Sequence, residues 1–392
     1  MIDANIWRAR FPGLQTPWAR FDNPAGTQVV DSAINAMRQF LESGNWANSS
    51  GYFAASRECD SLLQSARIKL ARLLGGGEDE IVIGPSTTAN IFMLTRALSH
   101  DWCEGDEIVC TELDMDSNVS PWLHAARQRG VRVRTAAVDA ATGTLDAARV
   151  EELINERTKW VAVTAASNAI GAAPDIERII RCAKAHSARV LVDAVAYVPH
   201  RRVDVGSLGC DVLVTSPYKW YGPHSGVMWV TRDLLETLRA VQLRAAHGLS
   251  RLEYGTAQFE IVAGIAAAVD FMEEVGYERI RAIEDGLTSR LLDGLATIDG
   301  ARVHGPVDGM QSRTSTVGFT VSGYQSSSVA EYLAGCNVAV WSGDFHAIEL
   351  VKAMNLESVG GFVRAGISVY NTVEEVDQLI RAIDDWTRHR AV

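Results

Sequence analysis

The sequence predicts an α/β protein with a mainly parallel, seven-stranded sheet covered by helices on both faces, plus a smaller α+β part. Two observations predict it. From about residue 80, short apolar runs rich in β-branched residues alternate with longer amphipathic stretches, as in crossover βαβ units. After a long helical region, roughly 260–298, the chain changes to a second pattern of short strands and helices.

Seven apolar runs are the expected strands of the large sheet, and amphipathic stretches fill most of the gaps between them. The stretch 175–187 begins just after Pro174 with acidic residues in its first turn, as helices commonly do. The expected strands lie near 80–83, 107–110, 131–138, 160–164, 190–193, 211–215 and 226–230.

The C-terminal part is shorter and mixes both kinds of element. We therefore expect a large domain over 1–270, whose segment 1–40 packs on the small domain, and a small α+β domain over 271–392. The small domain is expected to contain a strand at 315–321, a helix at 326–335, a strand at 337–341 and a helix at 373–388.

Composition narrows the classes of function. The 392 residues carry a formal net charge of −11, which disfavours nucleic-acid binding and favours small-molecule chemistry. No run approaches the roughly 18 to 20 apolar residues of a membrane helix, and the first residues lack a secretory signal, so we expect a cytoplasmic protein without membrane contact. The six cysteines form no C-x-x-C pair, so no metal site is expected.

One of the five lysines has a distinctive position. Lys219 directly follows the apolar run CDVLVTS, and ligands of α/β sheets bind beyond the carboxyl ends of strands. Desolvation there lowers the pKa of an amine and suits it to imine formation. Taken alone, the segment favours a lysine on an exposed turn. The other lysines lie in charged helical stretches or at the opposite end of a strand: Lys69, Lys159, Lys184 and Lys352.

Two further features are expected at the same edge of the sheet. Asp193 ends an apolar run, and a buried carboxylate needs a cationic partner, which is the ring nitrogen in a pyridoxal phosphate (PLP) site; a helix cap or an arginine pair is the alternative. Ser86 and Thr87 begin a helix, where free N–H groups and hydroxyls suit a phosphate, unless Ser86 is only a helix cap. Together, amine, carboxylate and cradle predict a PLP site.

Seven segments carry a resemblance along nearly the whole chain: FDNPAGTQV, GDEIVCTELDMDSNVSPW, ASNAIG, VDAVAYVPH, SPYKWYGPHSG, YGT and VRAGISVYNTVEEVDQL. With them the chain resembles the class V aminotransferase and cysteine desulfurase superfamily of fold-type I PLP enzymes, within its cysteine-desulfurase-like branch. The resemblance implies PLP as cofactor, an amino acid as substrate and a homodimer with shared active sites.

The resemblance also implies roles for single residues. Lys219 would hold PLP covalently and move the α-proton, and Asp193 would face the ring nitrogen. Arg364 would bind the substrate carboxylate in a bidentate pair, helped by Asn168. Thr256 would reach the phosphate of the neighbouring subunit's cofactor. The phosphate of the chain's own cofactor would be bound by Ser86, Thr87, Ser216 and Tyr218.

Four positions depart from the pattern of the desulfurases. Met115 stands where they carry a histidine that stacks on the cofactor ring, and a thioether cannot act as an acid or base. Ala196 replaces the residue that hydrogen-bonds the cofactor's phenolic oxygen. His346 aligns with the cysteine that accepts sulfur and acts either as an acid or base or only as a loop residue. Trp341 replaces an arginine, which indicates a larger or less polar substrate than cysteine.

These departures lead to one main expectation and several alternatives. We expect a carbon–sulfur β-lyase that acts on an S-substituted cysteine, because elimination needs no sulfur-accepting cysteine. The first alternative is transamination or decarboxylating oxidative deamination of a similar conjugate. The second is a cysteine desulfurase-like protein or a non-catalytic binding partner.

Overall fold

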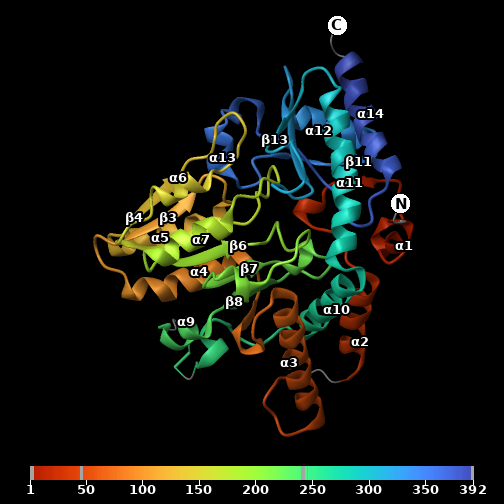
Figure 1. Ribbon diagram of the computed structural model, residues 1–392. Helices are drawn as coiled ribbons and strands as arrows, with labels where there is room; N and C mark the ends of the chain where they lie inside the picture. The colour runs from red at the N-terminus through yellow and green to blue at the C-terminus, as the bar shows by residue number, and fades with distance from the viewer. Residues whose placement is uncertain (1–3, 45–46, 240–242, 245, 390–392) are drawn as a thin grey trace.

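The computed structural model describes residues 4–44, 47–239, 243–244 and 246–389 (Figure 1). Its centre is a seven-stranded sheet of order β2-β8-β7-β6-β5-β3-β4. The strands pair in parallel except β8, which runs antiparallel to both of its neighbours, so the predicted fold class is confirmed. The strands are β2 (Ile81–Gly84), β3 (Glu107–Thr111), β4 (Arg132–Ala136), β5 (Thr158–Thr164), β6 (Arg189–Asp193), β7 (Val212–Thr215) and β8 (Gly226–Val230).

Helices cover both faces of this sheet. Along β3, Ile108 and Cys110 belong to one apolar cluster with α4 and α5, whereas Val109 belongs to another with α6 and α7. Successive side chains of a strand point to opposite faces, so a strand buried on both sides is apolar throughout. The helices are α4 (Thr87–Leu98), α5 (Ser120–Arg129), α6 (Ala147–Glu151), α7 (Ile176–Ala185), α8 (Val205–Leu208) and α9 (Arg232–Thr237).

The predicted helical region 260–298 is two helices, because Gly276 adopts φ +78° between them. The predicted strand 337–341 is wrong as a single strand. Val338–Ala339 (β11) pairs in parallel with Ala19–Arg20 (β1), whereas β12 starts at Trp341 and joins a four-stranded antiparallel sheet of order β12-β13-β10-β9. The other elements are α10 (Phe259–Val275), α11 (Tyr277–Ala296), β9 (Ala301–His304), β10 (Thr316–Val321), α12 (Ser326–Gly335), β12 (Trp341–Gly343), α13 (Ile348–Ala353), β13 (Phe362–Gly366) and α14 (Val373–His389).

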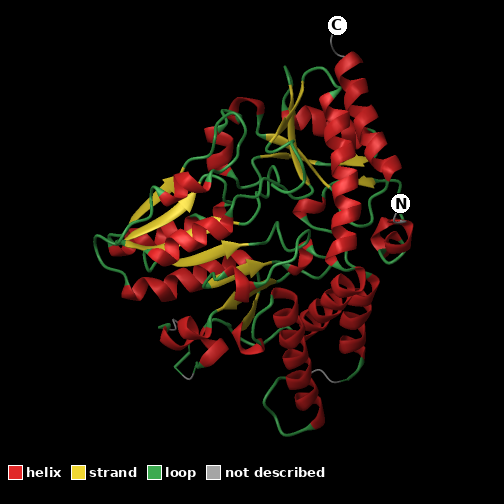
Figure 2. Ribbon diagram, in the orientation of Figure 1, coloured by secondary structure: helices red, strands yellow, loops and turns green. Residues whose placement is uncertain are grey.

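The N-terminal segment contacts the C-terminal elements. Besides the β1–β11 pair, Arg8 forms an ion pair of 2.8 Å with Glu375, and Asn23 Nδ2 donates to Asn371 Oδ1 over 3.0 Å. Below the sheet, a group of helices from distant parts of the chain packs together (Figure 2). They are α2 (Asp31–Glu42), α3 (Ala54–Leu74) and α10, and α1 spans Ala4–Arg8. The boundary between domains near residue 270 stays a prediction.

Short 3-10 helices connect these elements, and one of them carries the lysine singled out by the sequence. None of the helices in the described ranges is long and apolar enough to cross a membrane. The 3-10 helices are Pro12–Leu14, Asn23–Ala25, Glu78–Glu80, Ser99–Asp101, Asp116–Asn118, Pro217–Lys219, Gly248–Arg251 and Glu357–Val359.

Candidate active site

Lys219 lies at the carboxyl edge of the large sheet, at the end of the 3-10 turn that follows β7. Its side chain is buried, with only 6% exposed. Burial, and then the charge of Arg364, lowers the pKa of Lys219 to about 8, and the charge of Asp193 opposes the shift. The amine is therefore much closer to its neutral, nucleophilic form than an exposed lysine.

The turn that carries Lys219 is held by the N-terminal segment. Thr27 receives the N–H of Tyr221 on its hydroxyl over 2.9 Å, and its own N–H donates to the carbonyl oxygen of Tyr218 over 3.0 Å. Tyr221 has φ +72°, a left-handed conformation that a bulky residue adopts only where its surroundings enforce it. Sequence reasoning missed both Thr27 and Tyr221, because their contact joins segments almost 200 residues apart.

Asp193 ends β6 beside Lys219's strand and is 4% exposed. It accepts a hydrogen bond from the N–H of Val195 over 2.9 Å, and no arginine pairs with it among the described residues. Burial raises the pKa of Asp193, and this hydrogen bond and Lys219 offset part of the effect. A carboxyl group in this position is stabilised as an anion by a cationic ligand group.

A second buried carboxyl group lies close by and was not expected from the sequence. Asp114 is 2% exposed and accepts hydrogen bonds from the hydroxyl of Thr111 and from Asn118 Nδ2. Burial, with a contribution from the charge of Asp193, raises the pKa of Asp114 well above its usual range. Its hydrogen-bond partners are neutral side chains, so Asp114 has a structural role next to the site.

The predicted phosphate cradle is joined to the lysine turn. Ser86 caps α4 by accepting the N–H of Ala89 over 3.1 Å, and the hydroxyls of Thr87 and Ser216 lie 2.7 Å apart. A Cβ atom on Gly226 would lie 2.2 Å from the main chain of Ser86, so only glycine lets β8 approach the start of α4. The structure thus brings the three predicted hydroxyl residues to one place.

The other two predicted phosphate ligands lie differently. Tyr218 is half-buried, its ring stacks on His224 with centroids 5.1 Å apart, and burial raises its pKa. Thr256 is exposed in the loop before α10 and lines a cavity of about 160 Å³ with Pro85 and Ser225. Thr256 does not line the cavity at Lys219.

Arg364 and Asn168 meet directly. Arg364 is 4% exposed in β13, and its Nη1 donates to the main-chain oxygen of Asn168 over 2.9 Å. Burial lowers the pKa of Arg364 to about 9, and no carboxylate is paired with it in the part of the chain that the structure describes. Its Nε and the Oδ1 of Asn168 are buried without a hydrogen-bond partner. The Nε of Arg364 can donate to an anionic group of a ligand, and the Oδ1 of Asn168 can accept a hydrogen bond from a donor of that ligand.

A buried cation fastens the loop of Asn168 to the smaller sheet. Arg313 is 1% exposed, and its guanidinium donates to the main-chain oxygens of Thr316, Ile170, Thr314 and Pro306. Burial lowers the pKa of Arg313 to about 10. Because Ile170 follows Asn168 closely, Arg313 fixes the position of the Asn168 loop.

The four residues that depart from the family pattern differ in their surroundings. Met115 is half-buried, and the N–H of the residue after it donates to the main-chain oxygen of His346 over 2.7 Å. The His346 side chain is exposed. Trp341 is 53% exposed and is the cross-strand partner of Arg364. Ala196 lines a cavity of about 10 Å³ at Lys219, which is room for about one water molecule.

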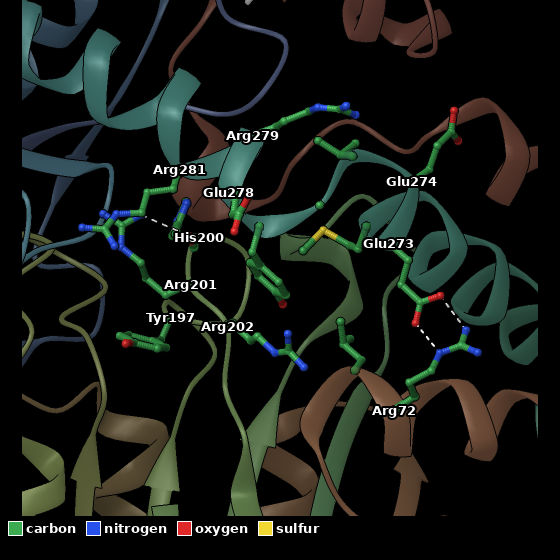
Figure 3. A pocket seen from close by; sticks show the side chains of 15 residues that line it. Arg72, Tyr197, His200, Arg201, Arg202, Glu273, Glu274, Glu278, Arg279 and Arg281 are labelled. Carbon is green, nitrogen blue, oxygen red and sulfur yellow. Dashed lines mark hydrogen bonds and ion pairs between the residues drawn. The ribbon is translucent and has the colours of Figure 1, made fainter. Parts of the chain in front are cut away.

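A larger cavity of about 860 Å³ lies around Gly276 (Figure 3). Arginines and glutamates surround it, with Arg72 paired to Glu273. Tyr197, the neighbour of Ala196 in sequence, lines this larger cavity and not the one at Lys219. The cavity contains none of the predicted catalytic residues, and its size does not make it the reactive site.

Comparison with known proteins agrees with this arrangement. The family model described as aminotransferase class-V matches residues 20–379. The chain belongs to this family. It is 31% identical over 417 residues to a probable cysteine desulfurase 2 of Mycobacterium leprae, covering 99% of this chain and 98% of the relative. It is also 31% identical to the aminotransferase-like protein FGM3 of Gibberella zeae, covering 96% of each.

Solved structures of class-V relatives have the same fold. The cysteine desulfurase CsdA of Escherichia coli, with an S-sulfonic acid, superposes with a TM-score of 0.89 at 27% identity and 98% coverage of both chains. The apo cysteine desulfurase of Thermococcus onnurineus NA1 gives a TM-score of 0.93 at 26% identity and 99% coverage. The fold-type I assignment and the predicted resemblance are therefore confirmed.

This class-V protein is a PLP enzyme, and its residues fit the cofactor. The buried Asp193 lacks a strong cationic partner, which a protonated ring nitrogen would supply. The amine with a lowered pKa at Lys219 would hold the aldehyde, and the hydroxyls of Ser86, Thr87 and Ser216 would hold the phosphate. The individual roles of these residues stay predictions.

Proposed function

We propose that this class-V enzyme cleaves the carbon–sulfur bond of an S-substituted cysteine by β-elimination. The substrate and one water molecule would give a thiol, pyruvate and ammonium, so no oxidant or sulfur acceptor is needed. The desulfurase relatives support chemistry at carbon–sulfur bonds. Retention of a buried lysine, a buried aspartate and a buried, uncompensated arginine supports a catalytic protein over a binding partner.

Each residue has a defined task in this proposal. Bound PLP supplies electron withdrawal from the α-carbon. Lys219 takes the α-proton, and its lowered pKa keeps the amine available as a base near neutral pH. Arg364 holds the substrate carboxylate through N–H groups that include its unpartnered Nε, and Asn168 helps by accepting a hydrogen bond from Arg364 Nη1 on its main-chain oxygen. Asp193 would keep the ring nitrogen protonated, because a buried carboxylate is stabilised by a cationic partner.

The proposal depends on one observation in the segment 344–346. His346 stands at the position expected for a sulfur-accepting cysteine, and an imidazole cannot carry a stable persulfide. The main chain of the segment is fixed at two successive residues, since Asn168 Nδ2 donates to the oxygen of Phe345 over 2.8 Å and the oxygen of His346 accepts from Asp116 N–H. Sulfur therefore leaves with its substituent and is not transferred to this loop.

A second candidate is cysteine desulfurase activity, which the names of the relatives favour. It would need another thiol. Cys336 is the cysteine nearest in sequence, half-buried at the end of α12, with its main-chain oxygen accepting from Gln378 Nε2 over 2.9 Å. A substitution of Cys336 by alanine tests this candidate directly, because a desulfurase that uses this thiol would lose activity.

The test is a panel of cysteine and S-substituted cysteines incubated with the PLP-loaded protein. Elimination gives equal amounts of thiol and pyruvate, abolished in Lys219→Ala and unchanged in Cys336→Ala. Alanine plus protein-bound sulfur would instead identify a desulfurase. A different keto acid without thiol would identify transamination, and oxygen uptake with carbon dioxide would identify oxidative decarboxylation. Any of these three results would contradict elimination.

We also propose that the protein is a homodimer with shared sites. The exposed Thr256 lies in a loop that lines a cavity with Pro85, next to the phosphate cradle, and not the cavity at Lys219. In such a dimer, Thr256→Val would weaken PLP binding although the residue lies outside the site of its own subunit. A monomer by sedimentation equilibrium would contradict the proposal.

A further inference from the structure

The segment 344–346 is a fixed and strained piece of main chain. Phe345 and His346 have φ +57° and +59°, two consecutive left-handed conformations in residues that are not glycine. Such conformations persist only where neighbouring contacts over-determine them. Here Asp344 Oδ1 accepts the N–H of His346 over 2.8 Å, and both following carbonyl oxygens are bound by Asn168 and Asp116.

The strained conformation places the ring of Phe345 against Arg364. The guanidinium carbon lies 3.8 Å from the ring centroid, which is within the range of a strong cation–π contact. Arg364 Nη1 donates to the oxygen of Asn168, and Asn168 Nδ2 donates to the oxygen of Phe345. The three residues therefore form a closed ring of contacts in which each one fixes the next.

This ring of contacts leaves specific groups free for a ligand. The Nε of Arg364 and the Oδ1 of Asn168 are buried and have no partner. The Phe345 ring covers one face of the guanidinium, so an anion reaches Arg364 through the N–H groups in its plane. A planar carboxylate meets this geometry, because guanidinium and carboxylate pair edge to edge.

We infer that Phe345 is the positioning residue for the substrate carboxylate: its ring holds the Arg364 guanidinium in place and keeps water from one face. The inference rests on the proposed function only in assigning an α-amino acid to this site. Because the arginine is oriented before the ligand arrives, less ordering is left for the binding step. Phe345 then acts on the binding of ligands that carry a carboxylate and leaves other amines unaffected.

The test measures binding and not turnover. PLP-loaded protein is titrated with L-alanine, which has no leaving group on its β-carbon, and with ethylamine, the same amine without the carboxylate. Binding is followed by the change in the visible absorption of the cofactor. In Phe345→Ala we expect the Kd for alanine to rise about 3- to 30-fold, the usual range for losing a cation–π contact. The Kd for ethylamine should stay within a factor of about two.

Two variants and one control separate positioning from general damage. Phe345→Tyr keeps an aromatic face and should restore alanine binding, whereas Phe345→Leu keeps volume without a π system and should behave as Phe345→Ala. Phe92→Ala is the matched control, since the Phe92 ring is 41% exposed and contacts His124 outside the site. If Phe345→Ala does not take up PLP, the comparison is made between Phe345→Leu and Phe345→Tyr.

The possible outcomes are distinct. Unchanged alanine binding in Phe345→Leu, equal weakening of both ligands, or failure of Phe345→Tyr to restore binding would each overturn the inference. A protein that binds alanine normally but releases no thiol from any conjugate would contradict the proposed elimination and leave Phe345 in its role. A lyase with normal binding in the Phe345 variants would retain the proposed function and lose only this inference.

Discussion

The strongest quantitative prediction concerns the amine of Lys219 in the cofactor-free protein. Burial, then the charge of Arg364, lowers its pKa to about 8 from 10.5, while Asp193 acts in the opposite direction. A pKa of about 8 leaves about 9% of the amine neutral at pH 7, against about 0.03% for an ordinary lysine. Lys219 should therefore present about 300 times more neutral amine than an exposed lysine.

Competitive labelling with acetic anhydride over a series of pH values measures this. The fraction of Lys219 modified is read by mass spectrometry, and the exposed Lys352 calibrates the reagent in the same sample. We expect a midpoint near pH 8. Limited access of the reagent changes the plateau but leaves the midpoint unaffected.

The two charged neighbours give the direction of further shifts. Arg364→Gln should move the midpoint upward, because a repelling charge is removed. Asp193→Asn should move it downward, because an attracting charge is removed. A wild-type midpoint near 10, or shifts of the opposite sign, would refute the electrostatic reasoning about this site.

Three other predictions concern stability and cofactor binding. The unfolded chain binds more protons at Lys219 than the folded apo protein between pH 8 and 10.5, so apo stability should rise with pH in this window. Lys219→Met should then stabilise the apo protein at pH 7 by up to about 3 kcal/mol in urea unfolding, and equal or lower stability would contradict this. Arg313→Met leaves buried carbonyl oxygens without donors and should lower the free energy of unfolding by about 3 kcal/mol, with Arg313→Lys between it and wild type. An unchanged urea midpoint would contradict the role of Arg313 in fixing the Asn168 loop. Gly226→Ala forces β8 away from Ser86 and should weaken PLP binding measured by equilibrium dialysis, whereas unaltered affinity would show that the cradle tolerates the shift.

The large sheet could be predicted because its strands are buried on both faces and are therefore apolar along their whole length. The small sheet was harder. Residues 337–341 have the composition of one strand, but Val338 pairs with Ala19 while Trp341 pairs with Arg364, and partners so distant in sequence leave no local signal.

The same limit applies to the candidate site. Asp193 is the last residue of one apolar strand and Lys219 follows the next, and these positions in the sequence are enough to predict that both lie at one edge of the sheet. Phe345 could not be predicted in this way. Its contact with Arg364 depends on a left-handed main-chain conformation, which the sequence does not indicate at a residue other than glycine. Thr27 was missed for a related reason, because its hydroxyl meets the lysine turn only after distant segments pack together.

The pairing of the first strand with β11 has a consequence for the order in which the molecule matures. Residues near position 20 leave the ribosome early. Ala19 can pair with Val338, and Asn23 with Asn371, only after these late residues have been synthesised. Until then the turn around Lys219 lacks the brace that Thr27 provides only when the N-terminal segment is anchored. Nascent chains should therefore acquire PLP only after nearly the entire polypeptide has been synthesised, as expected for a topology with such long-range contacts.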